Sequence, residues 1–293
     1  MNDEEGETTI DGFRFQIPTN DNMCAGILAG NRWEPHITGF ISTFVHPGDV
    51  CLDIGACFGY HTLHLSRQVG IGGLVHAFEP STTNAGLLRR NLDINSARNV
   101  QVHPIALGDL DQMTVLCHAT YRNTQNIGDG FLSTSFREMD GEVDLTMDDM
   151  ISKCGENIPL SKELVRCARL DSVSVGSQRV RLVKLDVQGF EKYVLDGARG
   201  TIARCRPTII MELEDPCCNL YKYDSGEIIR DLCGMDYEIY YLEHTYPADH
   251  VCVPREETAE FEQKFAGRIR PHSEDNSLNH NFSHGVTKKI CMS

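Results

Sequence analysis

Residues 49–59 read DVCLDIGACFG, and this stretch decides the fold class of the chain. Its first half is a short apolar run that follows the turn-forming residues 46–48, which predicts a buried strand. Gly55 and Gly59 come next, and residues 60–67 have the spacing of a helix. A strand, a glycine-containing turn and a helix in this order bring the backbone close to a ligand at the carboxyl edge of a parallel sheet.

The segments on either side continue this alternation of strands and helices. Strands are predicted at residues 73–79, 100–106, 180–186, 207–214 and 237–242, the last of them at the sheet edge. Helices are predicted at residues 85–94 and 190–203, with a hairpin at residues 113–120. The alternation predicts an α/β fold with a mainly parallel sheet and helices on both faces.

The composition excludes several classes of protein. The chain has 293 residues, with 27 Lys and Arg against 42 Asp and Glu; its formal charge of −15 should repel a phosphate backbone, so we expect no nucleic-acid partner. The twelve cysteines contain no Cys-x-x-Cys pair. The chain starts without the pattern of a signal peptide, and no run reaches the ~20 apolar residues of a membrane span. We therefore expect a soluble cytoplasmic protein with reduced cysteines.

The glycine turn favours S-adenosylmethionine over other nucleotide cofactors, because it matches neither the G-x-G-x-x-G turn of NAD and FAD sites nor a P-loop. Glu79 ends the next strand 24 residues after Gly55, where a carboxylate can accept both ribose hydroxyl protons. Asp53 would lie near the methionine ammonium. Alternatively, Asp53 caps the helix and Glu79 is a solvated strand end. The expected cofactor-binding residues are Asp53, Gly55, Ala56, Gly59, Tyr60, His61, Thr62, Glu79, Pro80 and Ala106.

Several motifs of the chain resemble one enzyme family. They lie at residues 53–63, 77–80, 183–191 and 194–198, with Asn91 and Glu212. The first occurs in many methyltransferases, whereas VKLDVQGFE at residues 183–191 is more particular. On these residues the chain resembles the FkbM family of S-adenosylmethionine-dependent methyltransferases, from about Trp33 to Leu242 without residues 121–165. The resemblance implies a class I Rossmann-like sheet and O-methylation, often of hydroxyls on sugars, glycans, lipids or polyketides. The family commonly has Glu where this chain has Gln188.

Asp186 is the candidate catalytic residue. The crevice of a doubly wound sheet opens where strand order reverses, so the strand tips carrying Asp53 and Asp186 would face each other. The enzyme must align the acceptor hydroxyl and help to remove its proton, so Asp186 could act as base or metal ligand. Lys184 could bind the acceptor hydroxyl or be structural, and Glu191 could support Asp186 or face solvent. Asp186, Glu191 and Glu212 offer oxygen ligands that suit magnesium but form no assembled triad, so a metal is kept only as an alternative.

The polar segment 121–165 interrupts the sheet pattern before the strand that leads to Asp186. Loops longer than about 12–15 residues are commonly lids or binding loops, so we expect this insertion to line the acceptor side of the crevice. A mobile surface insertion is the alternative, above all for the acidic residues 140–149. The expected acceptor contacts are Tyr121, Arg122, Asn123, Asn126, Phe131 and His244.

These patterns predict three regions and one main function. Residues 1–45 are expected to form an extension, residues 46–245 the S-adenosylmethionine-binding domain, and residues 246–293 a partly disordered segment. The predicted function is an S-adenosylmethionine-dependent O-methyltransferase that acts on a hydroxyl of a sugar or glycan. Two alternatives stay open: the acceptor is a polyketide, a lipid or another small metabolite, or the protein is a catalytically inactive binding protein with the same fold.

Overall fold

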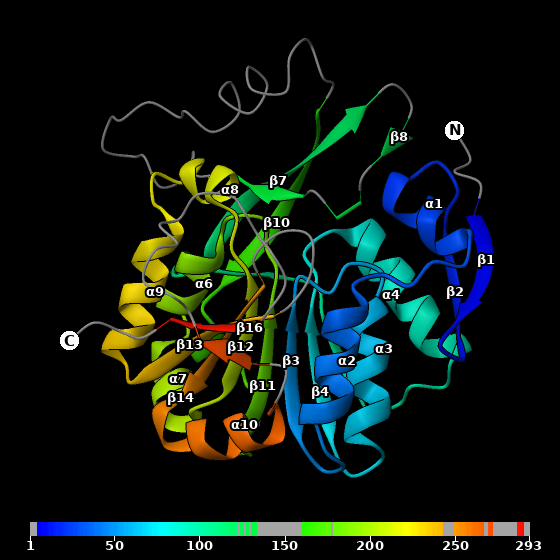
Figure 1. Cartoon of the computed structure of the whole chain (residues 1–293). Coiled ribbons are helices and arrows are strands. Elements are labelled where there is room, and N and C mark those ends of the chain that lie inside the picture. The colour runs from blue at the N-terminus through cyan, green and yellow to red at the C-terminus, as the bar shows by residue number, and fades with distance from the viewer. Residues whose placement is uncertain are drawn as a thin grey trace, which may run out of the picture.

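A mixed nine-stranded sheet forms the centre of the molecule, in the order β15-β16-β13-β14-β12-β11-β3-β4-β5 (Figure 1). The computed structural model describes residues 5–121, 124–125, 127–128, 130–133, 160–176, 178–242, 249–266, 269–271 and 286–289. The parallel core of the sheet comprises β3 (Val50–Ile54), β4 (Leu74–Phe78), β5 (Val100–His103), β11 (Val180–Leu185) and β12 (Thr208–Glu212). The predicted α/β fold with a mainly parallel core is therefore present.

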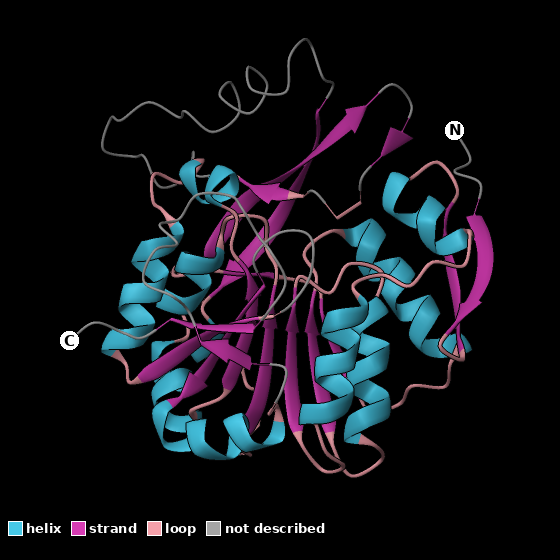
Figure 2. Cartoon of the chain, viewed as in Figure 1, coloured by secondary structure: helices cyan, strands magenta, loops and turns pink. Residues whose placement is uncertain are grey.

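Helices flank this sheet on both sides (Figure 2). All residues of β3 are buried, as expected for a parallel strand covered on both faces. Successive side chains alternate between the faces, so Cys51 packs in a cluster with one helix set and Leu52 in a cluster with the other. The first set is α2 (Pro35–Phe44), α3 (Tyr60–Val69) and α10 (Thr258–Lys264); the second is α6 (Glu191–Asp196), α7 (Arg199–Cys205) and α9 (Ser225–Gly234).

The N-terminal residues form a small unit against the first half of the sheet. It consists of the antiparallel strands β1 (Glu5–Ile10) and β2 (Phe13–Pro18) and the helix α1 (Asn22–Leu28). Phe15 of β2 is fully buried and stacks on Tyr60 of α3 with the ring centroids 5.2 Å apart. Leucines of α4 (Thr82–Ile94) belong to the same apolar cluster. The unit thus holds the start of α3, which borders the glycine turn.

A second sheet lies above the carboxyl edge of the first. Part of the predicted insertion, residues 121–165, belongs to this second sheet. Its strands are β6 (Ala106–Leu107), β7 (Gln112–Tyr121), β8 (Thr124–Gln125), β9 (Phe131–Leu132) and β10 (Leu160–Ala168). The hairpin expected within residues 113–120 is wrong, because β7 runs through that segment as one strand and pairs with β10. The local pattern could not show this pairing, because the paired residues lie far apart along the chain, from Ala119 with Leu160 to Gln112 with Cys167.

The C-terminal part of the sheet differs from the sequence prediction. We expected residues 237–242 at the sheet edge, but β13 (Tyr237–Tyr241) lies between β14 (Asp249–Pro254) and β16 (Val286–Lys289). β14 inserts antiparallel between β12 and β13 and is buried throughout. The central sheet therefore extends past residue 245, where we expected the domain to end. β15 (Ile269–Pro271) completes it.

The helix predicted over residues 190–203 is divided at Gly197 into α6 and α7. A Cβ at Gly197 would lie 1.8 Å from the carbonyl oxygen of Gly108, so the turn packs against the chain between β6 and β7. Hydrophobic spacing continues across such a turn and does not reveal it. The remaining elements are the short helix α8 (Asp215–Asn219) and the 3-10 turns Leu170–Ser172 and Arg255–Glu257.

The state of the cysteines and the lengths of the helices can be compared with the expectation of reduced thiols and of no membrane span. Nine cysteines of the described residues are free thiols, namely Cys24, Cys51, Cys57, Cys117, Cys167, Cys205, Cys217, Cys218 and Cys252. Cys233 is disulfide-bonded, so the expectation that every thiol is reduced is wrong at this position. Within the described ranges, every helix is too short or too polar to cross a membrane.

Candidate active site

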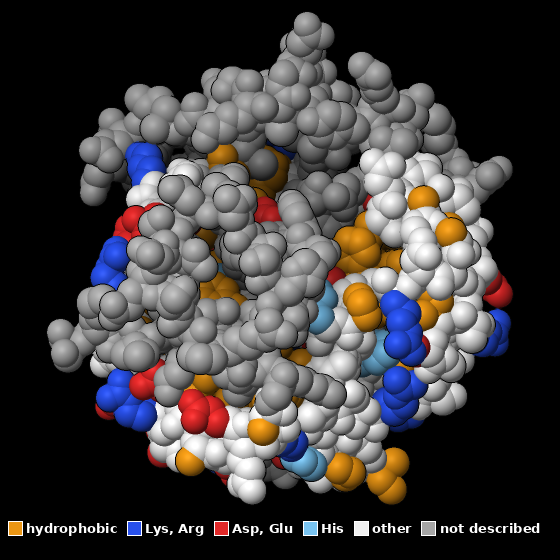
Figure 3. All heavy atoms as spheres, in the orientation of Figure 1, with side chains coloured by type: hydrophobic (Ala, Val, Ile, Leu, Met, Phe, Trp, Pro, Cys, Tyr) orange, Lys and Arg blue, Asp and Glu red, His pale blue; other side chains and the backbone are white. Residues whose placement is uncertain are grey.

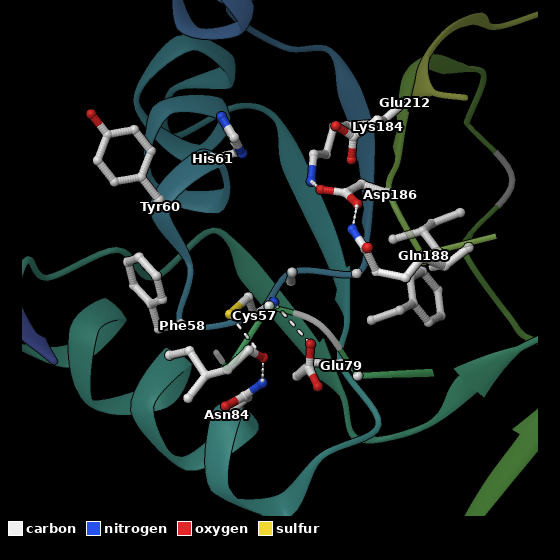
Figure 4. A pocket seen from close by; sticks show the side chains of 18 of the residues that line it. Cys57, Phe58, Tyr60, His61, Glu79, Asn84, Lys184, Asp186, Gln188 and Glu212 are labelled. Carbon is white, nitrogen blue, oxygen red and sulfur yellow. Dashed lines mark hydrogen bonds and ion pairs between the residues drawn. The ribbon is translucent and has the colours of Figure 1, made fainter. Parts of the chain in front are cut away.

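A cavity of about 880 Å³ opens at the carboxyl edge of the central sheet, where the strand order reverses between β3 and β11 (Figure 4). This is the position at which doubly wound sheets bind ligands. Both halves of the sheet supply its wall. The half with β3 and β4 contributes the glycine turn and Glu79, and the half with β11 and β12 contributes Lys184, Asp186 and Glu212.

Gly55 joins the two halves of this wall. Its backbone has φ of +84°, and a Cβ on it would lie 1.8 Å from the carbonyl oxygen of Asp186. The Asp186 amide in turn donates to the carbonyl oxygen of Ile54 at 3.0 Å. Only glycine allows this approach, so the turn after β3 and the turn after β11 form one packed unit.

Glu79 lies at the end of β4 with its carboxylate on the cavity wall. Its two oxygens accept the backbone N–H groups of Cys57 and Ser81, each at 2.9 Å. These bonds fix the carboxylate, and each oxygen keeps a further lone pair for a ligand. Burial raises the pKa of Glu79 to about 7, despite the two backbone hydrogen bonds that favour the charged form.

Asp53 lies behind the cavity wall rather than on it. The side chain is fully buried, its Oδ2 accepts the hydroxyl of Thr62 at 2.5 Å, and burial raises its pKa. Its Oδ1 has no hydrogen-bond partner among the described residues. Gly59 and Thr62 are likewise absent from the lining, whereas the other expected cofactor residues line the cavity: Gly55, Ala56, Tyr60, His61, Glu79, Pro80 and Ala106.

Asp186 is held from two sides at the tip of β11. Lys184 Nζ lies 3.0 Å from its Oδ2, and Gln188 Nε2 donates to its Oδ1 at 3.1 Å. Burial lowers the pKa of Lys184, but the carboxylates of Asp186 and Asp53 outweigh it and raise the pKa, so Lys184 is charged. Gln188 has φ of +54°, which turns its amide back toward Asp186. The carboxylate is therefore oriented before any ligand binds.

Glu191 supports the turn that follows Asp186 and does not line the cavity. Its Oε1 accepts the backbone N–H groups of Val187 at 3.0 Å and Gly189 at 3.2 Å. The hydroxyl of Tyr223 donates to the Gly189 carbonyl at 2.5 Å and reaches Glu191 Oε2 at 3.4 Å. Burial raises the pKa of Glu191 to about 7. Glu191 is thus a positioning residue rather than one that touches a ligand.

Glu34 and Asp249 add carboxylates that we did not predict from the sequence. They line the cavity beside Glu212, which pairs with Asp249 across β12 and β14. Burial, followed by the charges of Asp186, Asp249 and Glu34, raises the pKa of Glu212 to about 10. Burial and Asp186 likewise raise the pKa of Glu34 to about 8. Within the described residues, no group of three or more acidic, His or Cys side chains is arranged to hold a metal ion.

Two histidines face this acidic cluster. His36 Nε2 lies 2.6 Å from Asp249 Oδ2. His61 Nε2 lies 3.3 Å from Glu34 Oε2, but it makes no hydrogen bond within the described residues. Burial and the nearby charge of Lys184 hold the pKa of His61 well below its ordinary value, so this imidazole is neutral at pH 7.

A model of the FkbM methyltransferase domain matches residues 53–239, which is more than half of the chain. The chain belongs to the FkbM methyltransferase family. This confirms the resemblance stated from the motifs, and the class I methyltransferase fold expected from it is confirmed as well.

Individual relatives of this FkbM methyltransferase are distant. The AMB antimetabolite synthetase AmbE of Pseudomonas aeruginosa is 27% identical over 186 residues, which cover 58% of the chain but only 8% of AmbE. A solved FkbM methyltransferase of Methylobacillus flagellatus is 18% identical with a TM-score of 0.43, covering 70% of this chain and 43% of that one. A SAM-dependent O-methyltransferase of Thermotoga maritima is 13% identical with a TM-score of 0.42, covering 84% and 76%.

The acceptor residues expected in this FkbM methyltransferase are placed only in part. Phe131 of β9 lines the cavity together with other apolar side chains of the second sheet and its loops, such as Leu116, Ile127 and Leu132. Arg122, Asn123, Asn126 and His244 lie outside the described residues, as does the side chain of Tyr121. Trp33 and Glu34 had no motif to mark them, although their place just before the Pro35 helix start was a usable signal.

Proposed function

We propose that this FkbM methyltransferase uses S-adenosylmethionine to methylate a hydroxyl group of a sugar or glycan. The observation that carries the proposal is the position of Asp186, which stands at the strand reversal between the glycine turn and the acidic part of the cavity. A group at this point can reach both a cofactor over β3 and β4 and an acceptor over β11 and β12.

The residues on the β3 and β4 side suit S-adenosylmethionine. Glu79 offers a fixed carboxylate for the two ribose hydroxyls, which need an acceptor pair. Phe78, Ile105 and Ala106 supply an apolar wall beside it that fits an adenine ring. Asp53 is fully buried beneath the same turn, and its Oδ1 has no hydrogen-bond partner among the described residues. The features on the wall support a cofactor with a ribose and an aromatic base.

Asp186 is the proposed general base. The bound cofactor supplies an electrophilic methyl group on a sulfonium. Asp186 accepts the proton of the acceptor hydroxyl while the acceptor oxygen bonds to the methyl carbon and the methyl–sulfur bond breaks, which leaves the neutral thioether S-adenosylhomocysteine. Lys184 and Gln188 fix the two carboxylate oxygens, which keeps the base aligned with the cavity during transfer.

The surface is consistent with a small or carbohydrate acceptor. Figure 3 shows the Lys and Arg side chains of the described surface on this face in separate groups around the rim, interspersed with Asp and Glu. A phosphate backbone binds best to a continuous basic stripe. This distribution, together with the formal charge of −15, favours a hydroxylated acceptor over a nucleic acid.

The test is methyl transfer from labelled S-adenosylmethionine to a panel of glycosides, polyketide alcohols and lipid alcohols, with and without EDTA. We expect labelled ether products from glycosides, and no product with Asp186→Asn. An EDTA-sensitive rate would add a divalent metal to the proposal. Cofactor binding without transfer to any member of the panel would favour the inactive binding protein, and absence of cofactor binding in calorimetry would refute the proposal as a whole.

A further inference from the structure

We infer that the acceptor of this enzyme carries a protonated amine next to its reacting hydroxyl, and that Glu34, Glu212 and Asp249 bind this ammonium group. The inference rests on the proposed function and specifies its acceptor. It concerns the part of the cavity over β11, β12 and β14, which we call the acidic cluster and which comprises Glu34, Asp186, Glu212, Glu214 and Asp249.

The acidic cluster has more carboxyl groups than the protein has Lys and Arg side chains to pair with them. The cationic side chains on the cavity wall are Arg32 and Lys184, within the part of the chain that the structure describes. Arg32 is already paired with Asp11, and Lys184 with Asp186. No Lys or Arg in the described ranges is paired with Glu34 or Glu212. Glu34 and Glu212 therefore face the cavity without a Lys or Arg partner, whereas Asp249 lies 2.6 Å from His36 Nε2.

The raised pKa values agree with this count. Buried carboxylates that repel one another hold protons unless a cation approaches, and the cation then restores the charged form. Glu34, Asp186, Glu212 and Asp249 line the same cavity, and the charges of the other three add to burial in raising the pKa of Glu212. Binding of an ammonium group there would release protons from Glu34 and Glu212.

A second feature points to a ligand at this place. The His61 side chain is 6% exposed and lines the cavity, and its Nε2 has no hydrogen-bond partner among the described residues although it lies beside Glu34. Figure 4 shows its ring facing Lys184 and Asp186 across the open space. A buried ring nitrogen without a hydrogen bond is costly unless a ligand group or water meets it. A hydroxyl of the acceptor can supply that partner.

The cluster suits an organic ammonium better than a metal ion. Magnesium demands near-octahedral oxygen ligands at short distance, and the described residues contain no such group. An ammonium has three donors without a fixed coordination geometry, so it can bond to carboxylates that come from separate elements. Trp33 lines the same cavity and adds an aromatic face, on which cations also bind.

Two carboxylates of the cluster, Glu212 and Asp249, lie apart from the cofactor half. Glu212 and Asp249 belong to β12 and β14, which lie on the opposite side of β11 from the glycine turn and Glu79. Figure 4 shows Glu212 beside Lys184 and Asp186, away from Glu79 and Asn84. The charge of the cluster is thus directed at the acceptor, and Asp186 lies between the ammonium site and the cofactor half.

The experiment compares acceptors that differ only in charge. Methyl glycosides with an amino group at carbon 2, 3 or 6 are each paired with the methyl glycoside that has a hydroxyl at the same carbon. We expect kcat/KM for the best amine to exceed that of its neutral partner by about tenfold or more, the effect of one charge-assisted hydrogen bond. Glu212→Gln should abolish most of this preference, whereas Glu260→Gln, which removes an exposed charge from α10, should preserve it.

Binding is measured without turnover as well. Trp33 is the sole tryptophan of the chain and lines the cavity, so its fluorescence reports acceptor binding in the presence of S-adenosylhomocysteine. Tighter binding of the amine, lost in Glu212→Gln, supports the inference. Equal or tighter binding of the neutral partner, or no binding of any amine in the panel, overturns it. The proposed function fails separately, if calorimetry shows no cofactor binding or if no alcohol of any class is methylated.

Discussion

Replacing Gly55 with alanine tests the contact on which the active site depends. The new Cβ would lie 1.8 Å from the Asp186 carbonyl oxygen and 2.9 Å from its carbonyl carbon. Since Cβ atoms do not approach other heavy atoms within 3.0 Å, the two turns would have to separate by roughly 1 Å. Forced separation of this kind in a packed site costs about 1–3 kcal/mol. The positive φ adds about 1–2 kcal/mol for any residue with a Cβ.

Gly12 provides a matched control, because alanine at this position has the cost of a positive φ without a steric clash. It has φ of +82° in the β1–β2 turn, and a Cβ there would meet nothing within 4 Å. We expect Gly12→Ala to lower the free energy of unfolding by about 1–2 kcal/mol, and Gly55→Ala to lower it by about 1–3 kcal/mol more. Urea unfolding followed by circular dichroism measures both values.

The same substitution should affect catalysis. A shift of about 1 Å at Asp186 misaligns the proposed base, and misplacement of this size can reduce the rate about 10²-fold. Gly12→Ala should retain the wild-type rate. If the two variants lose equal stability and Gly55→Ala turns over normally, then the close approach of Gly55 to Asp186 does not exist in solution, and the packed unit described above would have to be abandoned.

Three further predictions concern single carboxylates. Glu79→Ala should weaken binding of S-adenosylmethionine by on the order of 1.5–3 kcal/mol in calorimetry, and unchanged affinity would remove Glu79 from the cofactor site. Asp186→Asn should lower kcat about 10²–10⁴-fold while the affinity for S-adenosylhomocysteine stays within twofold or so; a wild-type rate would make Asp186 structural. Glu191 has a pKa raised to about 7, so its contribution to stability is present at low pH and is lost as pH rises through 7. The wild type should therefore lose stability relative to Glu191→Gln as pH rises from 4.5 to about 7, by up to about 1.4 kcal/mol per pH unit in thermal or urea unfolding, whereas parallel curves would show that Glu191 titrates normally.

The half of the cavity that we assign to the cofactor could be outlined from the sequence because its residues are close along the chain. A strand, two glycines and a helix start fall within residues 50–60, and Glu79 follows the next strand, so local spacing implies spatial proximity. Asp53 and Thr62 were expected on the wall, but they bond to each other beneath it. The order of strands and helices shows that a side chain lies at the carboxyl edge of the sheet. It does not show whether the turn that follows the strand covers that side chain.

The other half could be predicted only in part: Asp186, Lys184 and Glu212 were candidates from the sequence, but Glu34 and Asp249 were not, because they come from distant segments. Glu34 precedes α2, Glu212 ends β12 and Asp249 begins β14. No spacing rule connects these positions, and Asp249 lies in the segment 246–293, which we expected to be partly disordered. β14 runs antiparallel to β12, so its first residue, Asp249, lies at the edge of the sheet where the parallel strands end. Such a reversal is a property of the assembled sheet, and no short window of sequence contains it.

The place of β14 also determines where the chain can be cut. A fragment that stops at residue 245 would leave the hydrogen-bonding groups of β12 and β13 facing an empty slot, since β14 occupies the space between them. Exposed strand edges of this kind recruit strands from other molecules. Recombinant fragments of this enzyme should therefore extend at least through α10, and shorter ones should be found in the insoluble fraction.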